Sequence, residues 1–242
     1  MYDRRTGRGY DGIDGPNAVN LGAGAESTIE ALMAMQTLAI HPVARAYAGF
    51  VRTREAALTR LVEAEDGFPA AGSPRIHRLG RGEGQGPAGG GSYSGEAYAV
   101  LHPGDVLRWT VRGLPPGEYL VHAVLQKEAD GDPGTEARVT VDGRPVGRVS
   151  SASGWRRPLL WMDRVGEAVR VGTGSIVLEL GVAETEQGRL RLDALLLQPV
   201  QAYRVLEDAA GRRVRVRKDV LSGRATVGAI EEGSTPQGGG DG

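Results

Sequence analysis

The most constraining feature of this sequence is a change in its hydrophobic period after residue 92. Beyond that point apolar residues alternate with polar ones, as Leu107, Trp109 and Val111 do. Tyr119 and Val121 begin a second alternating run, after a turn rich in proline and glycine. A period of two places successive side chains on opposite faces of a strand. The sequence therefore predicts β-strands with one buried face.

Shorter strand patterns continue to the end of this region. They cover residues 137–141, 145–149, 159–162, 169–171, 176–180 and 190–197, followed by residues 203–206 and 214–216. Between the first two lies Asp142-Gly143, a pair that tolerates the positive φ angles of a tight hairpin turn. Many short strands with regular turns predict a mainly β fold, an antiparallel β-sandwich or jelly roll.

The residues before this region favour helices. Residues 1–24 have a loop composition, and Ser27 and Glu30 then have the spacing of a capping box. A helical stripe follows and ends near His41, and a second one runs from Pro42 to Gly67. The sequence predicts an N-terminal helical hairpin, whose two apolar stripes need the β domain, another chain or further helices for burial.

These patterns divide the chain into four parts. We expect a loop and helical hairpin in residues 1–72, a sandwich in 73–200, a C-terminal β-hairpin in 201–232 and a disordered tail in 233–242. The glycine-rich residues 80–91 form a linker. The hairpin is basic through Arg212, Arg213, Arg215, Arg217 and Lys218. The simpler interpretation is an edge strand protected by charge, and a polyanion site is the alternative.

The overall charge excludes some partners. The 29 basic and 30 acidic residues nearly cancel, which argues against nucleic acid or a membrane surface as the main partner. Cysteine is absent, so disulfides and thiolate metal sites are excluded. No apolar run is long enough to span a bilayer, and the first residues lack a secretory signal. As written, the chain is expected in the cytoplasm; it would be extracellular if the N-terminus is truncated.

A family resemblance lies in the order of several short motifs. The segments Tyr93-Ser94-Gly95, Tyr98-Ala99-Val100 and Gly104-Asp105 precede Trp109, and Pro116-Gly117-Glu118-Tyr119 follows it. This order resembles carbohydrate-binding modules of the CBM6/CBM35 type, which have a galactose-binding-like fold, across residues 75–199. Residues 10–30 resemble the last active-site loop and helix of an (α/α) toroid in carbohydrate-active enzymes, of which this chain supplies two helices.

The resemblance implies sugar binding by aromatic rings, with polar side chains that contact the hydroxyls. Trp155 follows a loop-like run and stands beside Arg156 and Arg157, so we take Trp155 and Arg156 as ligand-binding candidates. The alternative for Trp155 is a plug at the open end of the sandwich. We assign Trp109, Tyr119 and Trp161 to the interior. Tyr93 and Tyr98 are further ligand-binding candidates that could instead line the interface with the helices.

The resemblance also raises the question of calcium, which family members often hold through acidic residues on the first strand and near the last. Asp193 matches the last position, but residues 75–79, taken as the first strand, carry no acidic pair. We therefore expect no strong calcium site and no other cofactor. Asp130, Asp132 and Glu136 form a second acidic group, which a solvated hairpin loop explains more simply. The four histidines lack the spacing of a zinc site.

Carboxylates near the first helix are the weak catalytic candidates. Asp11 and Glu26 are the best of a set that includes Asp14, Asn17 and Asn20. Turn formation and helix capping explain them more simply. We expect non-catalytic carbohydrate binding by a module appended to a carbohydrate-active enzyme, with a polysaccharide and a catalytic domain on another chain as partners. The alternatives are a fragment of a toroid glycoside hydrolase or polysaccharide lyase, and a structural sandwich without a ligand.

Overall fold

The computed structural model describes residues 2–3, 5–6, 8–10, 12–15, 18–20, 24–41, 45–79, 93–94, 97–131, 133–172 and 174–230. The chain forms two compact units. The first, the N-terminal unit, comprises residues 1–54, 206–214 and 229–242; the second, the sandwich unit, comprises residues 55–205 and 215–228.

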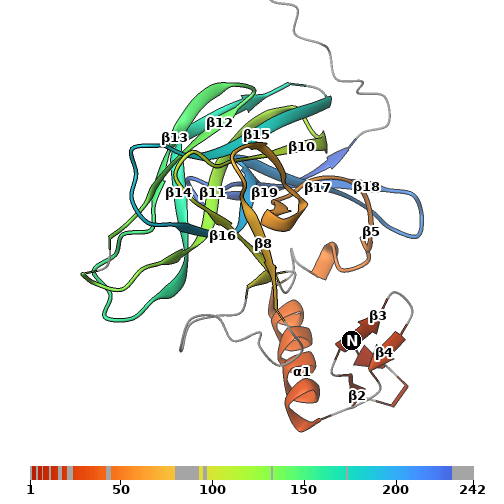
Figure 1. Ribbon diagram of the computed structural model, residues 1–242. Coiled ribbons are helices and arrows are strands. Elements are labelled where there is room, and N and C mark those ends of the chain that lie inside the picture. The colour runs from red at the N-terminus through yellow and green to blue at the C-terminus, as the bar shows by residue number, and fades with distance from the viewer. Residues whose placement is uncertain are drawn as a thin grey trace, which may run out of the picture. The chain divides into compact units, whose positions relative to one another are not determined.

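Eleven of the described strands build two antiparallel sheets in the sandwich unit (Figure 1). They are β6 (Arg60–Glu63), β7 (Phe68–Ala71), β8 (Arg75–Arg78), β9 (Ala97–Leu101), β10 (Val106–Leu114), β11 (Gly117–Lys127), β12 (Glu136–Val141), β13 (Arg144–Ser150), β14 (Leu159–Val171), β15 (Gly174–Val182) and β16 (Leu190–Pro199). One sheet has the order β13-β12-β15-β10-β7. The other has the order β14-β11-β16-β9-β8, and β6 also pairs with β16.

Side chains from both sheets form one hydrophobic core. On β10, Leu107, Trp109 and Val111 are buried, and on β11 Tyr119 and Val121 are buried with them. Trp109 and Tyr119 therefore belong to the core, as predicted. The Tyr119 hydroxyl donates a hydrogen bond of 2.8 Å to the carbonyl of Pro115, which satisfies its polar end. The alternating pattern thus confirms the mainly β, antiparallel sandwich.

The strand predictions agree well with this part of the structure. Asp142 and Gly143 have φ angles of 50° and 74°, so they form the tight turn between β12 and β13. Residues 159–162 and 169–171, predicted as two strands, belong to one continuous strand, β14, whose pairing with β11 shifts register once. An irregularity of this kind in the pairing lets one long strand continue through a point where its apolar and polar residues stop alternating.

The second predicted helix is wrong. Residues 52–66 form β5 (Arg52–Ala57), β6 and the short 3-10 helix η1 (Ala64–Asp66). β6 pairs with β16, and Val62 and Ala64 are buried in the core of the sandwich. Burial of these side chains and pairing with a sheet outweigh a helical spacing that extends over only a few turns.

The N-terminal unit contains the short strands β1 (Tyr2–Asp3), β2 (Arg8–Gly9), β3 (Gly12–Gly15) and β4 (Ala18–Asn20) and the helix α1 (Ala25–Ile40). The first predicted helix is therefore present. Its capping box is wrong, because the helix begins at Ala25 with Gly24 as the N-cap, so Ser27 lies within the first turn. A Cβ on Gly9 would lie 2.3 Å from the carbonyl oxygen of Ser27, which shows how closely β2 approaches α1.

A buried carboxylate lies in the later part of the N-terminal unit. Glu207 accepts contacts from the guanidinium groups of both Arg54 and Arg213. These hydrogen bonds lower the pKa of Glu207 to about 2. Arg213 is thus one of the basic hairpin residues with an acidic partner, and Arg212 pairs with Asp208 at 2.7 Å.

The C-terminal strands are β17 (Gln201–Glu207), β18 (Arg213–Asp219) and β19 (Ala225–Ile230), in a sheet of order β19-β18-β17-β5. β17 and β18 contain the strands predicted at residues 203–206 and 214–216. The predicted tail, residues 233–242, and the linker, residues 80–91, lie outside the described residues. In the described part of the chain, no helix has the length and hydropathy to cross a membrane.

Candidate functional site

Trp155 is an exposed side chain in the loop between β13 and β14. Its side chain is 52% exposed, and Arg156 and Arg157 beside it are exposed as well. The backbone N–H of Asp130 donates to the Trp155 carbonyl at 2.7 Å, and the Ser153 hydroxyl donates to the Glu128 carbonyl at 2.5 Å. These bonds fix the loop to the segment that follows β11 while the indole faces solvent.

The prediction that Trp161 lies in the interior is wrong. Its side chain is 48% exposed, and that of the next residue, Met162, is 52% exposed. β14 is the edge strand of its sheet, and both faces of its first residues are at least partly exposed. An apolar run on an edge strand is therefore not buried as it would be on a central strand.

The two exposed indoles lie side by side and form what we name the tryptophan platform, defined by Trp155 and Trp161. Their ring centroids are 6.0 Å apart, and the ring planes are inclined by 39°. Asp163, two residues after Trp161 on β14, pairs with Lys127 at 2.5 Å. Lys127 is buried, so the exposed charged side chains nearest the rings in the sequence are Arg156 and Arg157. Two aromatic faces with hydrogen-bond donors beside them suit a polyhydroxylated ring.

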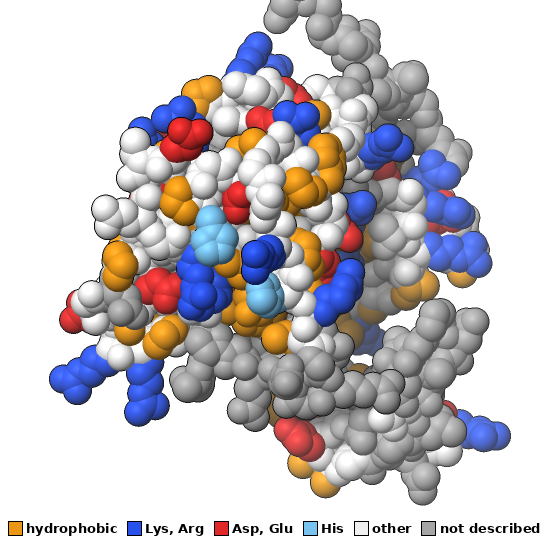
Figure 2. All heavy atoms as spheres, viewed as in Figure 1, with side chains coloured by type: hydrophobic (Ala, Val, Ile, Leu, Met, Phe, Trp, Pro, Cys, Tyr) orange, Lys and Arg blue, Asp and Glu red, His pale blue; other side chains and the backbone are white. Residues whose placement is uncertain are grey.

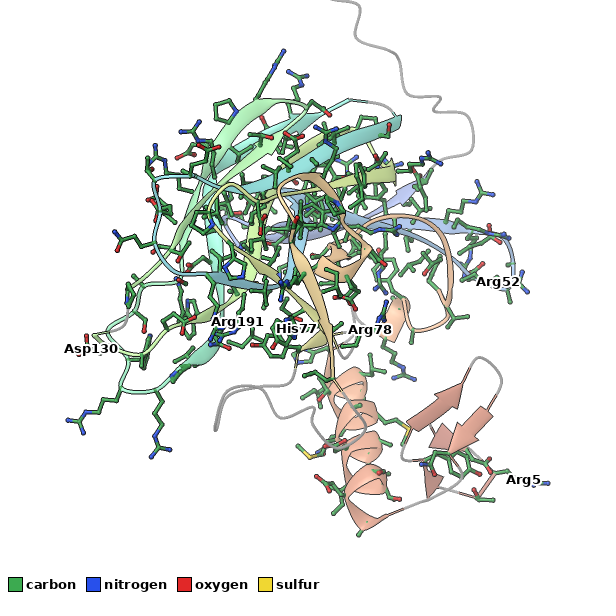
Figure 3. The ribbon with its side chains drawn as sticks, viewed as in Figure 1. Arg5, Arg52, His77, Arg78, Asp130 and Arg191 are labelled. Carbon is green, nitrogen blue, oxygen red and sulfur yellow. The ribbon has the colours of Figure 1, made fainter. Side chains whose placement is uncertain are left out.

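Tyr93 and Tyr98 take part in a separate ring stack. Tyr93 is buried, donates to Gln126 Oε1 at 2.7 Å and has a pKa raised to about 12, mainly by burial. Its ring stacks on Tyr98 at 4.4 Å, and Tyr98 stacks on His77 at 5.3 Å. His77, on β8, is the exposed member of this stack. Figure 3 shows the exposed end of the stack, His77, far from Asp130, whose backbone N–H donates to the Trp155 carbonyl. The buried end lies nearer the tryptophan platform, because Gln126, which accepts from Tyr93, pairs with Leu160 of β14.

A group of carboxylates surrounds Asp193 on β16. The Ser94 backbone N–H donates to Asp193 Oδ1 at 2.7 Å, and the Ser94 hydroxyl contacts both Asp193 Oδ1 at 3.0 Å and Glu63 Oε2 at 2.5 Å. The pKa of Asp193 is raised to about 6, mainly by burial. The Ser94 hydrogen bonds lower it and the nearby charges of Glu63 and Glu65 raise it. We name Glu63, Glu65 and Asp193 the carboxylate cluster.

The acidic partners of Asp193 were sought in residues 75–79, but the carboxylate cluster shows that they lie elsewhere. The acidic residues near Asp193 lie at the end of β6 and in η1, with Glu63 opposite Ala194 and Glu65 two residues later, and not in residues 75–79. Glu65 Oε2 is buried and has no hydrogen-bond partner, and none of the ion pairs in the described residues involves the cluster. Carboxylate oxygens are the donor type that a hard cation such as calcium prefers, and a cation would offset their repulsion.

The side chains of the carboxylate cluster are not yet arranged as ligands. Among the described residues, no three histidine, aspartate or glutamate side chains are spaced to hold one metal ion as they stand. Glu63, Glu65 and Asp193 would therefore have to rotate toward a cation in order to share it.

The catalytic candidates receive little support from geometry. Asp11 lies outside the described residues, and Glu26 is exposed in the first turn of α1. Of the second acidic group, Asp132 also lies outside the described residues, Asp130 is exposed, and Glu136 pairs with Arg148 at 2.6 Å. On the face of the sandwich seen in Figure 2, basic and acidic side chains are interspersed.

Comparison with known proteins finds a likeness in structure alone. No family model matches the chain, and no curated protein matches it. The GH26-CBM35 β-(1,4)-mannanase of Podospora anserina is 14% identical over 59% of this chain and 28% of the mannanase, with a TM-score of 0.43. A family 35 carbohydrate-binding module of Clostridium thermocellum is 17% identical over 57% of this chain and 96% of the module, with a TM-score of 0.41.

A third similar structure is the CBM36-1 domain of a multidomain xylanase from the hindgut metagenome of Trinervitermes trinervoides. It is 16% identical over 57% of this chain and 95% of that domain, with a TM-score of 0.37. At these identities and scores the likeness concerns the general fold, and the ligand has to be argued from this chain's own residues.

Two features of the site are missed by the sequence analysis. Glu63 and Glu65 lie at the end of β6 and in η1, within the segment predicted as a helix. Trp161 follows Trp155 closely in the sequence, and two tryptophans within one short segment of a chain with 5% aromatic residues are themselves a signal of a shared surface.

Proposed function

We propose that this chain is a non-catalytic carbohydrate-binding protein and that the tryptophan platform is its sugar-binding surface. The observation that carries the proposal is the exposure of two adjacent indoles, at 52% and 48%, on a loop and strand held by hydrogen bonds. Large aromatic side chains are usually buried, so two of them together on the surface favour a binding role.

The chemistry of the platform suits a polysaccharide better than an apolar ligand. Indole faces stack on the C–H faces of a pyranose, while the exposed guanidinium group of Arg156 can donate hydrogen bonds to its hydroxyls. The resemblance of the sequence to modules of the CBM6/CBM35 type supports the same class of ligand. Tyr93 has little part in this surface, because its ring is buried.

We further propose that the sandwich unit is appended to a helical enzyme domain. On α1, Ile29, Leu32, Met33 and Ile40 share one face, and each of them is at least 48% exposed. An exposed apolar stripe of this kind is typical of a helix that packs against other helices. We keep the proposed boundary at residue 200, with an additional β-hairpin after it, but not the one at residue 72, because β6 and β7 place residues 60–71 in the sandwich unit.

A polysaccharide array tests the proposal. Purified full-length protein should be applied in calcium and in chelator beside the Trp155→Ala variant, whose exposed position makes misfolding a small risk. We expect retention on at least one glycan and its loss in the variant. Absence of binding to every glycan in both conditions would instead favour a structural sandwich that stabilises a partner.

A further inference from the structure

A hollow of about 350 Å³ opens between β6 of one sheet and β10 of the other. Its lining includes Arg60, Leu61, Asp66, Trp109 and Arg112. β7 pairs with β10 only from Val106 to Arg108, so in the described chain this hollow flanks the part of β10 beyond the end of β7. It does not include the tryptophan platform or the carboxylate cluster.

The inner wall of the hollow is rigid. Trp109 is 3% exposed, and its Nε1–H donates to the Glu63 carbonyl at 2.9 Å. A Cβ on Gly67 would lie 2.7 Å from the indole ring, so the ring has no room to turn on that side. Trp109 thus fixes the floor of the hollow, and Leu61, which is 46% exposed, supplies its accessible apolar surface. A wall that is already in place reduces the ordering cost of binding.

The rim of the hollow carries two arginines, Arg60 and Arg112, whose side chains have no partner within the described part of the chain. No ion pair or side-chain hydrogen bond among the described residues involves Arg60 or Arg112, whereas Arg108, four positions before Arg112, pairs with Glu179 at 2.5 Å. Each guanidinium group offers a fork of N–H donors that matches a carboxylate. Asp66 supplies the opposite charge, so the charges of the three ionised side chains leave a net +1 at the rim.

We propose that this hollow binds a small hydroxy-carboxylate. Arg60 and Arg112 receive its carboxylate, Leu61 contacts its carbon skeleton above the buried Trp109, and Asp66 accepts a hydrogen bond from its hydroxyl group. An inorganic anion would contact the two arginines only. It has no carbon skeleton to contact the apolar wall and would give Asp66 no hydroxyl to bind. Both sugar acids and open-chain hydroxy acids contain the required carboxylate, carbon skeleton and hydroxyl group. The inference does not depend on the tryptophan platform.

The indole N–H signals of the full-length protein give a direct test, because the chain contains three tryptophans and Trp109 alone lines the hollow. Sodium glucuronate, 3-hydroxybutyrate, glucose and sulfate should be titrated separately, at constant ionic strength. We expect a saturable shift of the Trp109 signal with one or both hydroxy-carboxylates. A response to glucuronate alone identifies a sugar acid, and a response to both identifies the wider class.

The double variant Arg60→Gln/Arg112→Gln should weaken this binding at least tenfold, because two charge-assisted contacts are lost. Arg138→Gln, an exposed arginine that lines a different hollow, is the matched control and should bind as the parent does. Trp155→Ala should also bind normally. The proposal is overturned if neither acid shifts Trp109, if sulfate gives the same saturable shift, or if the double variant retains full affinity with an unchanged melting temperature.

Discussion

The indole rings of Trp155 and Trp161 lie 6.0 Å apart and are inclined by 39°, although one belongs to a loop and the other to an edge strand. Three hydrogen bonds in and around the loop hold Trp155 in place, including one from its own N–H to the Ser153 hydroxyl at 3.2 Å. The surface is therefore present before any ligand arrives, and this preorganisation favours binding.

Loop support of the tryptophan platform can be tested without removing either ring. Ser153→Ala deletes the hydroxyl that bonds the Glu128 carbonyl and accepts from the Trp155 N–H. We expect this variant to bind glycan several-fold more weakly with little change in melting temperature, as measured by calorimetric titration. Ser175→Ala, at an exposed position on β15, is the control. Unchanged affinity in the Ser153 variant would contradict a role for the loop bonds.

Calcium should stabilise the protein through the carboxylate cluster. A bound cation offsets the repulsion among Glu63, Glu65 and Asp193, and a ligand at a hundred times its Kd adds about 2.7 kcal/mol to the free energy of unfolding. We expect the melting temperature at pH 7 to rise by several degrees over that in chelator. Glu65→Gln and Asp193→Asn should lose this rise, while Glu184→Gln, at an exposed position, should keep it. Equal melting temperatures in calcium and chelator would rule the site out.

The Glu207 carboxylate should make stability fall in acid. Its pKa is lowered from 4.5 to about 2 by Arg54 and Arg213, so its contribution is fully present above pH 4.5 and is lost as pH falls toward 2. Glu207→Gln should remove part of the decline in the free energy of unfolding across this window, as measured by urea denaturation. Glu184→Gln should follow the parent profile. An unaltered acid profile in the Glu207 variant would show that the two arginines do not hold its pKa down.

Gly166 should be intolerant of any side chain. Its φ angle is 57°, and a Cβ there would lie 2.0 Å from the carbonyl oxygen of Val146 on β13. We expect Gly166→Ala to reduce the free energy of unfolding by about 1 kcal/mol or more, because left-handed backbone and a backbone clash both oppose it. Gly172→Ala, where a Cβ meets nothing within 4 Å, is the matched control. Equal stability of the two variants would contradict the close approach of β13 and β14.

The sandwich was predictable because its physical signals are local. Alternation in β10 and β11 follows from one buried face, and the turn at Asp142 and Gly143 follows from the backbone angles that these residues tolerate. The pairing of β6 with β16 joins residues 131 positions apart in the sequence, Glu63 and Ala194, and no local pattern specifies it.

One error accounts for much of what the sequence analysis missed at the candidate sites. Assigning residues 42–66 to a helix hid β6, and with it Glu63 and Glu65 beside Asp193. Trp161 was missed for a different reason, because an apolar strand pattern does not distinguish an edge strand from a central one. Trp155 was identified correctly as a loop residue, since serine, glycine and arginine surround it.

The most direct test of the central claim is calorimetric titration of one oligosaccharide, chosen from the array, into the parent protein and into Trp155→Ala and Trp161→Ala. Stacking on each ring is part of the proposed contact, so we expect saturable binding by the parent and at least a tenfold higher Kd in each variant. The control variant Arg138→Gln, whose exposed side chain lines a separate hollow, should bind as the parent does. Parent-like affinity in both tryptophan variants, with saturable binding retained, would contradict the claim and locate the sugar site elsewhere.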